Sequence, residues 1–157
     1  MPVDSKFPRD VELLLLESGW SPDRRVSPDS YIHELRTMGY PIVAAAIECL
    51  SHLGGLHVSG GVTPFHFDPL SASGLRWGVS EYPARFGGLV TPIGETMGDT
   101  VLLIDDKGAV FGGFADWVVR FGESLPEAVT YLCRPGKPKL WVQKGTPPPP
   151  PAPAAPA

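Results

Sequence analysis

The sequence predicts an α+β domain: N-terminal helices, a mainly antiparallel central sheet and a C-terminal helix. Three helices are indicated before residue 54, by apolar residues at helical spacing in two segments and by start and end signals around a third. From about residue 56 to residue 121 the chain changes to short β-type runs separated by turn residues, and a helical pattern with a clear start signal follows at 124–132. Helices followed by consecutive strands are typical of α+β domains, whereas a doubly wound parallel sheet alternates the two.

The three N-terminal helices are expected at about residues 8–18, 31–38 and 41–53. The first and third segments carry apolar residues on one face, and the second follows a cap and a proline at the first helical position in Ser27–Ser30. Gly19, Gly39 and the pair at 54–55 follow the three segments directly as end signals. The C-terminal helix begins at a capping box, because Ser124 and Glu127 stand three residues apart before an apolar stripe.

The clearest β signal is a hairpin at 101–111. A run of four apolar residues at 101–104 precedes the turn residues at 105–108, and the apolar pattern then resumes. Four consecutive apolar residues predict a strand covered on both faces. Asp105 and Asp106 are expected to form the turn, and Gly108 to adopt a positive φ angle.

Other strands are expected at 56–70, at 89–93 and at 117–121. In the first of these stretches, Phe65 and Phe67 should lie on one face and His66 on the other, since strand side chains alternate. The segment 71–88 has no clear period and is either an irregular loop or a weak helix. A polar, glycine-punctuated loop should join residue 93 to the hairpin.

Composition divides the chain into a folded domain at 1–134 and a tail at 135–157. Proline and alanine dominate the end of the chain, which predicts an extended, disordered, polyproline-like segment. The N-terminus has neither a signal-peptide pattern nor an apolar run long enough to span a membrane, so a cytoplasmic location is expected.

Charge favours a protein partner over a nucleic acid. The whole chain has a net charge of −4, but all 17 acidic residues precede Arg134, and residues 1–133 stand at −8. Such a surface repels phosphates and attracts a basic protein. The alternative is that the acidity serves solubility.

No motif for catalysis, a cofactor or a metal is present. His33, His52, His57 and His66 are scattered over two expected helices and two expected strands, without an HExxH or CxxC partner. Cys49 and Cys133 fall inside expected helices and are interpreted as buried small hydrophobes. The paired glycines do not form a phosphate-binding loop. We therefore expect a protein that is not an enzyme and holds no cofactor.

The candidate partner-binding residues are aromatic, basic and acidic side chains in loops or near strand ends. Aromatic side chains and arginine are enriched at interface hot spots, and loops over a rigid sheet often carry recognition. An alternative is that the aromatic side chains fold back over the sheet. The residues are Arg76, Trp77, Tyr82, Arg85, Phe86, Glu95, Asp99 and Asp116.

Six segments in order resemble the SUKH superfamily, and specifically its third immunity-protein subfamily. They are LLLESGWSPDRRV (14–26), AAAIECLSHLGGLHV (44–58), FHFDPL (65–70), PIGE (92–95), VLLIDDKGAVFGGF (101–114) and FGESLPEAVTYL (121–132). Each consists of helix-end glycines, turn residues and core apolar residues, so the resemblance depends on the order and spacing of all six.

The resemblance implies an α+β domain that works by binding. Members of this kind are cytoplasmic antidotes that neutralise a cognate bacterial toxin, often a nuclease, during competition between bacteria. The acidic domain fits this expectation, since a nuclease is basic where it holds phosphates. Relatives in the wider superfamily also include scaffold and regulatory proteins, which leaves a protein-interaction module with a polyproline tail as the alternative. The resemblance does not explain the tail.

Overall fold

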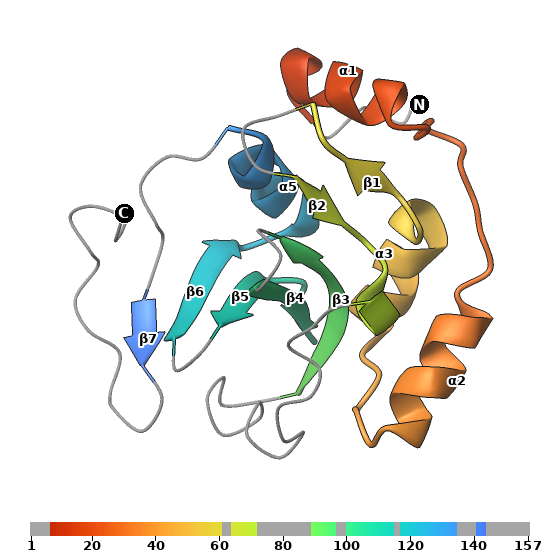
Figure 1. Cartoon of the computed structure of the whole chain (residues 1–157), viewed down its shortest axis with the longest axis vertical. Coiled ribbons are helices and arrows are strands. Elements are labelled where there is room, and N and C mark those ends of the chain that lie inside the picture. The colour runs from red at the N-terminus through yellow and green to blue at the C-terminus, as the bar shows by residue number, and fades with distance from the viewer. Residues whose placement is uncertain are drawn as a thin grey trace.

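The computed structural model describes residues 7–60, 64–71, 89–96, 100–114, 117–134 and 141–143. Within these ranges the chain forms helices and strands in the predicted order as far as the C-terminal helix, after which one further strand follows (Figure 1). The elements are α1 (Arg9–Glu17), α2 (Asp29–Thr37), α3 (Ala44–Leu53), β1 (His57–Val58), β2 (Phe65–His66), the short 3-10 helix η1 (Pro69–Ser71), β3 (Val90–Thr96), β4 (Thr100–Asp105), β5 (Val110–Phe114), β6 (Trp117–Gly122), α5 (Leu125–Cys133) and β7 (Trp141–Gln143).

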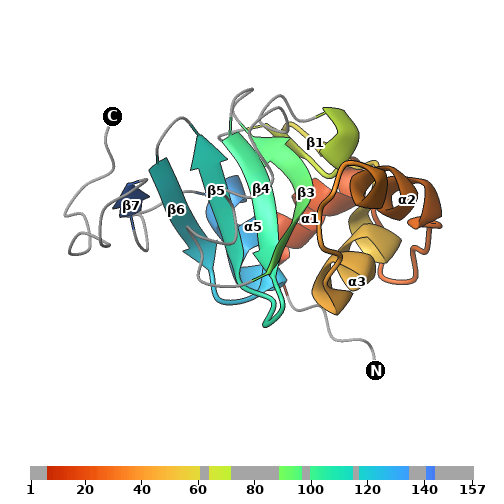
Figure 2. The same ribbon diagram turned by 90° about the horizontal axis from the view of Figure 1, so that it is seen from below.

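The described strands form one sheet in which each strand pairs with its neighbours in the chain. The spatial order is β1-β2-β3-β4-β5-β6-β7, and every pair is antiparallel. Figure 2 shows β3 to β6 side by side, with β7 at one end of the row. The predicted α+β class with an antiparallel sheet is confirmed.

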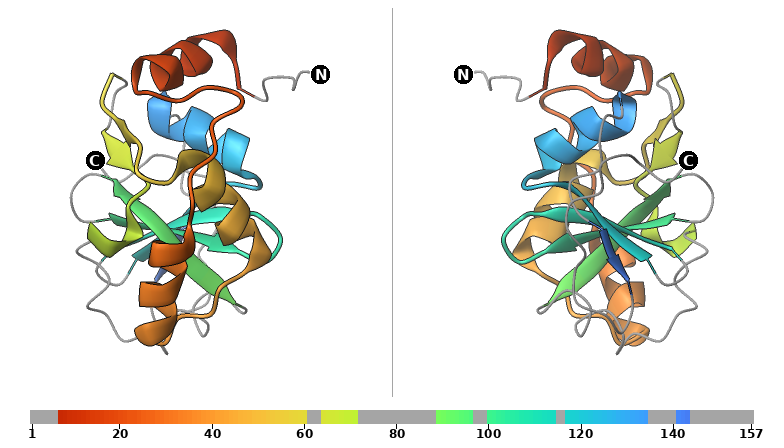
Figure 3. Two further views of the ribbon diagram at one scale, coloured as in Figure 1. Left: turned by 90° about the vertical axis from the view of Figure 1, so that its right-hand side faces the viewer. Right: turned by 90° about the vertical axis from the view of Figure 1, so that its left-hand side faces the viewer.

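Helices α1, α3 and α5 cover one face of the sheet (Figures 1 and 3). Their buried side chains, such as Leu15, Leu50 and Val129, pack in one core with strand residues that include Leu102 and Phe121. Phe65 and Phe67 belong to this core, whereas His66 between them points away from it, as the alternation predicts.

A second, smaller core lies on the opposite face. It contains Leu35 from α2 and Tyr40 from the α2–α3 connection, packed with Val101, Leu103 and neighbouring strand residues. Residues 101–104 are each at most 2% exposed and contribute alternately to the two cores. The predicted two-sided burial of this strand is therefore confirmed.

The turn between β4 and β5 forms as predicted. One Asp105 carboxylate oxygen accepts the backbone N–H groups of Lys107 and Ala109, both at 2.9 Å. Gly108 has a φ of +93°, which glycine adopts without strain. Asp106 is exposed at the turn. Asp105 thus serves the turn.

The C-terminal helix α5 starts at the predicted capping residue. The Ser124 hydroxyl oxygen accepts the Glu127 N–H at 3.3 Å. The Glu127 carboxylate in turn accepts the N–H of Glu123 at 2.6 Å, one residue before the cap. Two backbone N–H groups at the start of the helix are satisfied in this way.

Two boundaries differ from the sequence prediction. Strand β3 continues to Thr96, so Gly94 and Glu95 lie in the sheet and not in the loop expected after residue 93. The predicted strand ended before these residues because they are not apolar. Their place in the sheet depends on the pairing of Glu95 and Thr96 with β2, which the local sequence does not indicate. Residues 141–143, expected to lie in an extended tail, form β7 against β6. The rest of the tail and the segment 72–88 lie outside the described residues.

Candidate partner-binding site

Three polar side chains form a row across the strands at one edge of the sheet. His57 of β1 is the register partner of His66 of β2, and His66 is the register partner of Glu95 of β3. Directly paired residues place their side chains on the same face. The two imidazole rings lie 5.1 Å apart between centroids, with an interplanar angle of 31°. The row lies on the face away from the helices α1, α3 and α5, because Val58 and Phe65 fill the core on the other side.

Hydrogen bonds fix the orientation of the central histidine. The backbone N–H of Asp68 donates to His66 Nδ1 at 3.1 Å. Since Nδ1 accepts, the proton of the ring lies on Nε2, which faces Glu95 Oε1 at 3.3 Å. Glu95 is only 7% exposed, so its carboxylate forms the inner end of the row.

A pocket of about 230 Å³ lies beside this row and is partly open to solvent. Its wall is mostly apolar. The polar side chains that line it include the exposed His57 and Ser59 and the buried Glu95. The full lining is His57, Val58, Ser59, Pro64, Phe65, His66, Glu95 and Thr96. Pockets for drug-sized ligands are larger, at about 300–1,000 Å³. The size therefore suits a single side chain of a partner protein.

The strands that hold the pocket approach each other closely. A Cβ atom at Gly94 would lie 1.9 Å from the carbonyl oxygen of His66, so only glycine fits there. The Thr96 hydroxyl donates to the Pro64 carbonyl at 2.9 Å and closes the same edge. The pocket is consequently held by backbone packing on β2 and β3 rather than by long side chains.

Of the residues predicted from the sequence, Glu95 alone lies in the described ranges, and it lies in a strand at the pocket. Arg76, Trp77, Tyr82, Arg85, Phe86, Asp99 and Asp116 fall outside those ranges. The strand ends on either side of Asp99 and Asp116 are described. Thr96 pairs with Thr100, and Phe114 pairs with Trp117, at the same end of the sheet as the pocket.

Sequence reasoning missed the pairing of His57 with His66 and treated the histidines as scattered. Alternation within each short strand does place both rings on one face. Their adjacency depends on the register between two strands of two residues each, and a longer alternating pattern would have been needed to predict that register.

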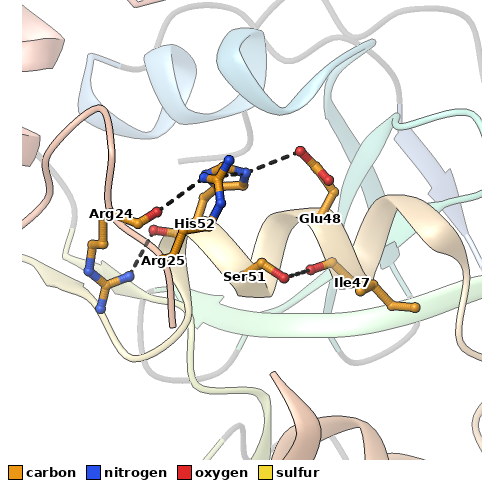
Figure 4. A network of polar contacts seen from close by, with 6 residues as sticks. All are labelled: Arg24, Arg25, Ile47, Glu48, Ser51 and His52. Carbon is orange, nitrogen blue, oxygen red and sulfur yellow. Dashed lines mark hydrogen bonds and ion pairs between the residues drawn. The ribbon is translucent and has the colours of Figure 1, made fainter. Parts of the chain in front are cut away.

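A second polar cluster, around His52, serves the packing of the chain (Figure 4). The Arg24 guanidinium donates to the carbonyl oxygens of His52 and Gly54 at 2.8 and 2.9 Å, at the carboxyl end of α3. A cation is favourable there because it satisfies carbonyls left unpaired by the helix. His52 also contacts Glu48 at 3.1 Å and the side chain of Arg25. The cluster binds the segment before α2 to α3.

The two cysteines lie buried in the main core, as predicted. Burial raises the pKa of the Cys49 thiol far above its ordinary value. The pKa of Cys133 rises to about 11, mainly through burial and secondly through the charge of Asp10. A thiol with a raised pKa is a poor nucleophile and metal ligand at neutral pH. Within the described residues, no group of three or more His, Cys, Asp or Glu side chains could hold a metal ion.

The helices of the described ranges are also too short or too polar to cross a bilayer, for which about 20 apolar residues are needed.

The fold and the pocket define a class: an α+β protein whose antiparallel sheet is covered by α1, α3 and α5 on one face, packs against α2 on the other, and has a small pocket at one edge. Among known families, the SUKH-3 immunity protein matches residues 7–135. The chain therefore belongs to the SUKH-3 immunity protein family, and the resemblance seen in its six sequence segments is confirmed. No curated protein and no solved structure matches it.

Proposed function

We propose that this chain is a cytoplasmic immunity protein that binds a cognate bacterial toxin and neutralises it without catalysis. The observation that carries the proposal is membership of the SUKH-3 immunity protein family over residues 7–135. The proposed mechanism is stoichiometric occlusion: the bound protein covers the surface through which the toxin engages its own target.

Charge supports a basic toxin, such as a nuclease, as the partner. Residues 1–133 have a net charge of −8. An acidic surface attracts a basic protein and so accelerates their encounter. This attraction weakens as salt screens the charges. A nuclease needs cationic groups near its phosphate site, so an acidic inhibitor can occlude that site. The expected signature is a toxin association rate that falls with ionic strength.

The pocket beside His57, His66 and Glu95 is the proposed anchor point for one toxin side chain. It is small and mostly apolar, and the exposed His57 ring gives it an aromatic surface. Interface hot spots concentrate where one side chain fills such a pocket and excludes water. We assign the surrounding contacts to Asp99, Asp116 and the aromatic and basic residues of 72–88, together with the pocket-lining Glu95.

Coexpression with the toxin candidate encoded beside this chain tests the function. The expected result is rescue of cell growth and a stable one-to-one complex of the purified proteins. Absence of both binding and protection, for every neighbouring candidate, would contradict the proposal.

A pair of matched variants tests the pocket. Ser59 is exposed at the pocket, and Ser59→Trp places a bulky ring there; Ser30→Trp makes the same change at an exposed position of α2. We expect Ser59→Trp to weaken toxin binding by about tenfold to a hundredfold, since loss of an anchor contact typically costs about 2 kcal/mol or more. Equal affinities of the two variants, at equal thermal stability, would exclude the pocket as the anchor.

The run of prolines at 147–151 favours a second candidate, a scaffold or regulatory module that offers a polyproline ligand. Deletion of residues 144–157 keeps β7 and removes this run. An immunity protein should retain its toxin affinity after the deletion, whereas a tail-dependent adaptor should lose its partner.

A further inference from the structure

The far edge of the sheet is formed by a strand that lies outside the family domain. The family match ends at residue 135, and β7 spans Trp141–Gln143. β7 is antiparallel to β6 and pairs Trp117 with Gln143, Val118 with Val142 and Val119 with Trp141. Figure 2 shows β7 at the end of the row of strands, next to β6. The edge strand of the family domain itself is therefore β6.

β6 is firmly held from both faces. Val119 and Phe121 pack in the main core, and Val118 packs in the second core. Its neighbour β5 pairs with it from Phe114 to Val110. A strand held in this way presents its outer backbone N–H and C=O groups in a fixed row, which an extended segment can pair with. β7 demonstrates that this edge accepts an antiparallel strand.

β7 occupies only part of this edge. Its three residues pair with the first three residues of β6, whereas β6 continues to Gly122. Arg120 is the first residue beyond the paired stretch. Its Nη1 atom contacts a carboxylate oxygen of Glu123 at 2.5 Å, and its guanidinium carbon lies 5.1 Å from the centre of the Phe111 ring. Among the described residues, Arg120 Nε is a buried donor without an acceptor. The Arg120 side chain as a whole is 28% exposed, so a longer strand with a carboxylate group at this point would place an acceptor next to its positive charge.

We propose that the β6 edge is a strand-addition site for an extended segment of the toxin, and that β7 is the chain's own occupant of this site, which the toxin segment displaces. The inference rests on the proposed function for the identity of the partner. The toxin segment pairs antiparallel with residues 117–122, is longer than β7 and carries an acceptor for Arg120. Because β7 is attached to the domain, it competes at a high effective concentration. The apparent association constant of the toxin is therefore the intrinsic constant multiplied by the fraction of molecules in which β7 is detached.

Val142→Pro in the full chain tests the competition. Proline lacks the backbone N–H and disfavours strand pairing, so β7 should detach. Ala154→Pro is the matched control, since it adds the same residue within the proline-rich end. We expect hydrogen exchange to accelerate in Val142→Pro alone, at those amides of residues 117–119 that point toward β7 and not at those that point toward β5. Its toxin affinity should rise about tenfold if β7 is docked nine-tenths of the time. An unchanged or weaker toxin affinity would overturn the proposal.

A labelled peptide with the sequence of residues 139–144, KLWVQK, separates this proposal from the proposed function. It should bind Val142→Pro and should bind Ala154→Pro at least about tenfold more weakly, because β7 blocks the edge there. Equal binding to both would exclude the strand-addition site. If the peptide binds Val142→Pro more tightly than Ala154→Pro but no toxin binds either variant, the strand-addition site is supported and the toxin is excluded as its occupant. If Val142→Pro does not fold, Trp141→Gly combined with Val142→Gly weakens the same strand without proline.

Discussion

The two edges of the sheet are built in different ways. At the β1–β3 edge, Gly94 lets β2 approach β3 closely, and Thr96 donates a hydrogen bond to the Pro64 carbonyl. At the β6 edge, β7 adds three paired residues from beyond the family domain. The first edge belongs to the main core and holds the pocket lined by His57, His66 and Glu95. The second consists of a rigid strand and a short added one. A small pocket suits recognition of one side chain, whereas an edge strand suits recognition of a partner's backbone.

The largest expected effect is at Gly94. Gly94→Ala would place a Cβ atom 1.9 Å from the His66 carbonyl oxygen and force β2 away from β3. We expect the free energy of unfolding to fall by about 3 kcal/mol, as for other changes that overpack a core. Urea denaturation followed by circular dichroism measures it.

The control for Gly94 is Gly108→Ala in the β4–β5 turn. Gly108 has a φ of +93°, and a Cβ there meets no atom within 4 Å. Its substitution costs backbone strain alone, about 1 kcal/mol. If Gly94→Ala proved as mild as Gly108→Ala, the first edge would not depend on close backbone packing.

The next largest effect is expected at Thr91, which links β3 to the α2–α3 connection. Its hydroxyl donates to the Pro41 carbonyl at 2.8 Å and accepts the Val43 N–H at 2.9 Å. Thr91→Val keeps the shape and leaves both backbone groups unpaired, so we expect a loss of about 2 kcal/mol in the free energy of unfolding. Thr91→Ser retains the hydroxyl and should lose less. A larger loss for serine would mean that packing of the methyl group dominates.

The smallest expected effect is a pH dependence of stability. It comes from Cys49 in α3 and Cys133 in α5, two helices that cover different parts of the sheet. The pKa of both buried thiols is raised, so the folded state holds these protons more tightly than the unfolded state does. This contribution to stability is present below pH 9 and falls as the pH rises: the Cys133 part is lost by about pH 11, whereas the Cys49 part continues to fall above that pH. We expect the melting temperature to fall over that range, and to fall less in Cys49→Ala and Cys133→Ala.

Thiol labelling at pH 8 resolves the two cysteines. The pKa of Cys133, about 11, is raised less than that of Cys49. Cys133 in α5, the helix next to β6, should therefore react with a thiol reagent before Cys49 in α3, although both react more slowly than in the unfolded chain. Faster labelling of Cys49 would show that the region around α3 opens more readily.

The sequence allowed the main elements of the fold to be predicted because their signals are local. Helix-end glycines, the Ser124 cap and the Asp105–Gly108 turn each act within a few residues. Long-range pairings were not predictable in the same way. Glu95 looks like a loop residue in the sequence, but it lies in β3 because Gly94 lets a distant strand approach.

The candidate site was predictable only in part for the same reason. Glu95 was selected as a polar residue near a strand end, and it does lie in the pocket lining. The juxtaposition of His57 and His66 depends on the register between two very short strands. The strand at 141–143 was missed because its proline-rich surroundings conceal three residues that pair with β6. Composition describes the average of a segment, whereas pairing depends on individual residues.

The strand order has a consequence for how the protein is made. Each described strand from β2 to β7 pairs with the strand that precedes it in the chain. From β3 to β6 the pairing of sequence neighbours closes short loops and keeps the entropy cost of each step small, which favours rapid folding of this part of the sheet. The sheet can therefore grow in step with synthesis, as each new strand leaves the ribosome and meets a partner already present. In that sequence of events β7 is the last of the described strands to be added, after the family domain has been translated.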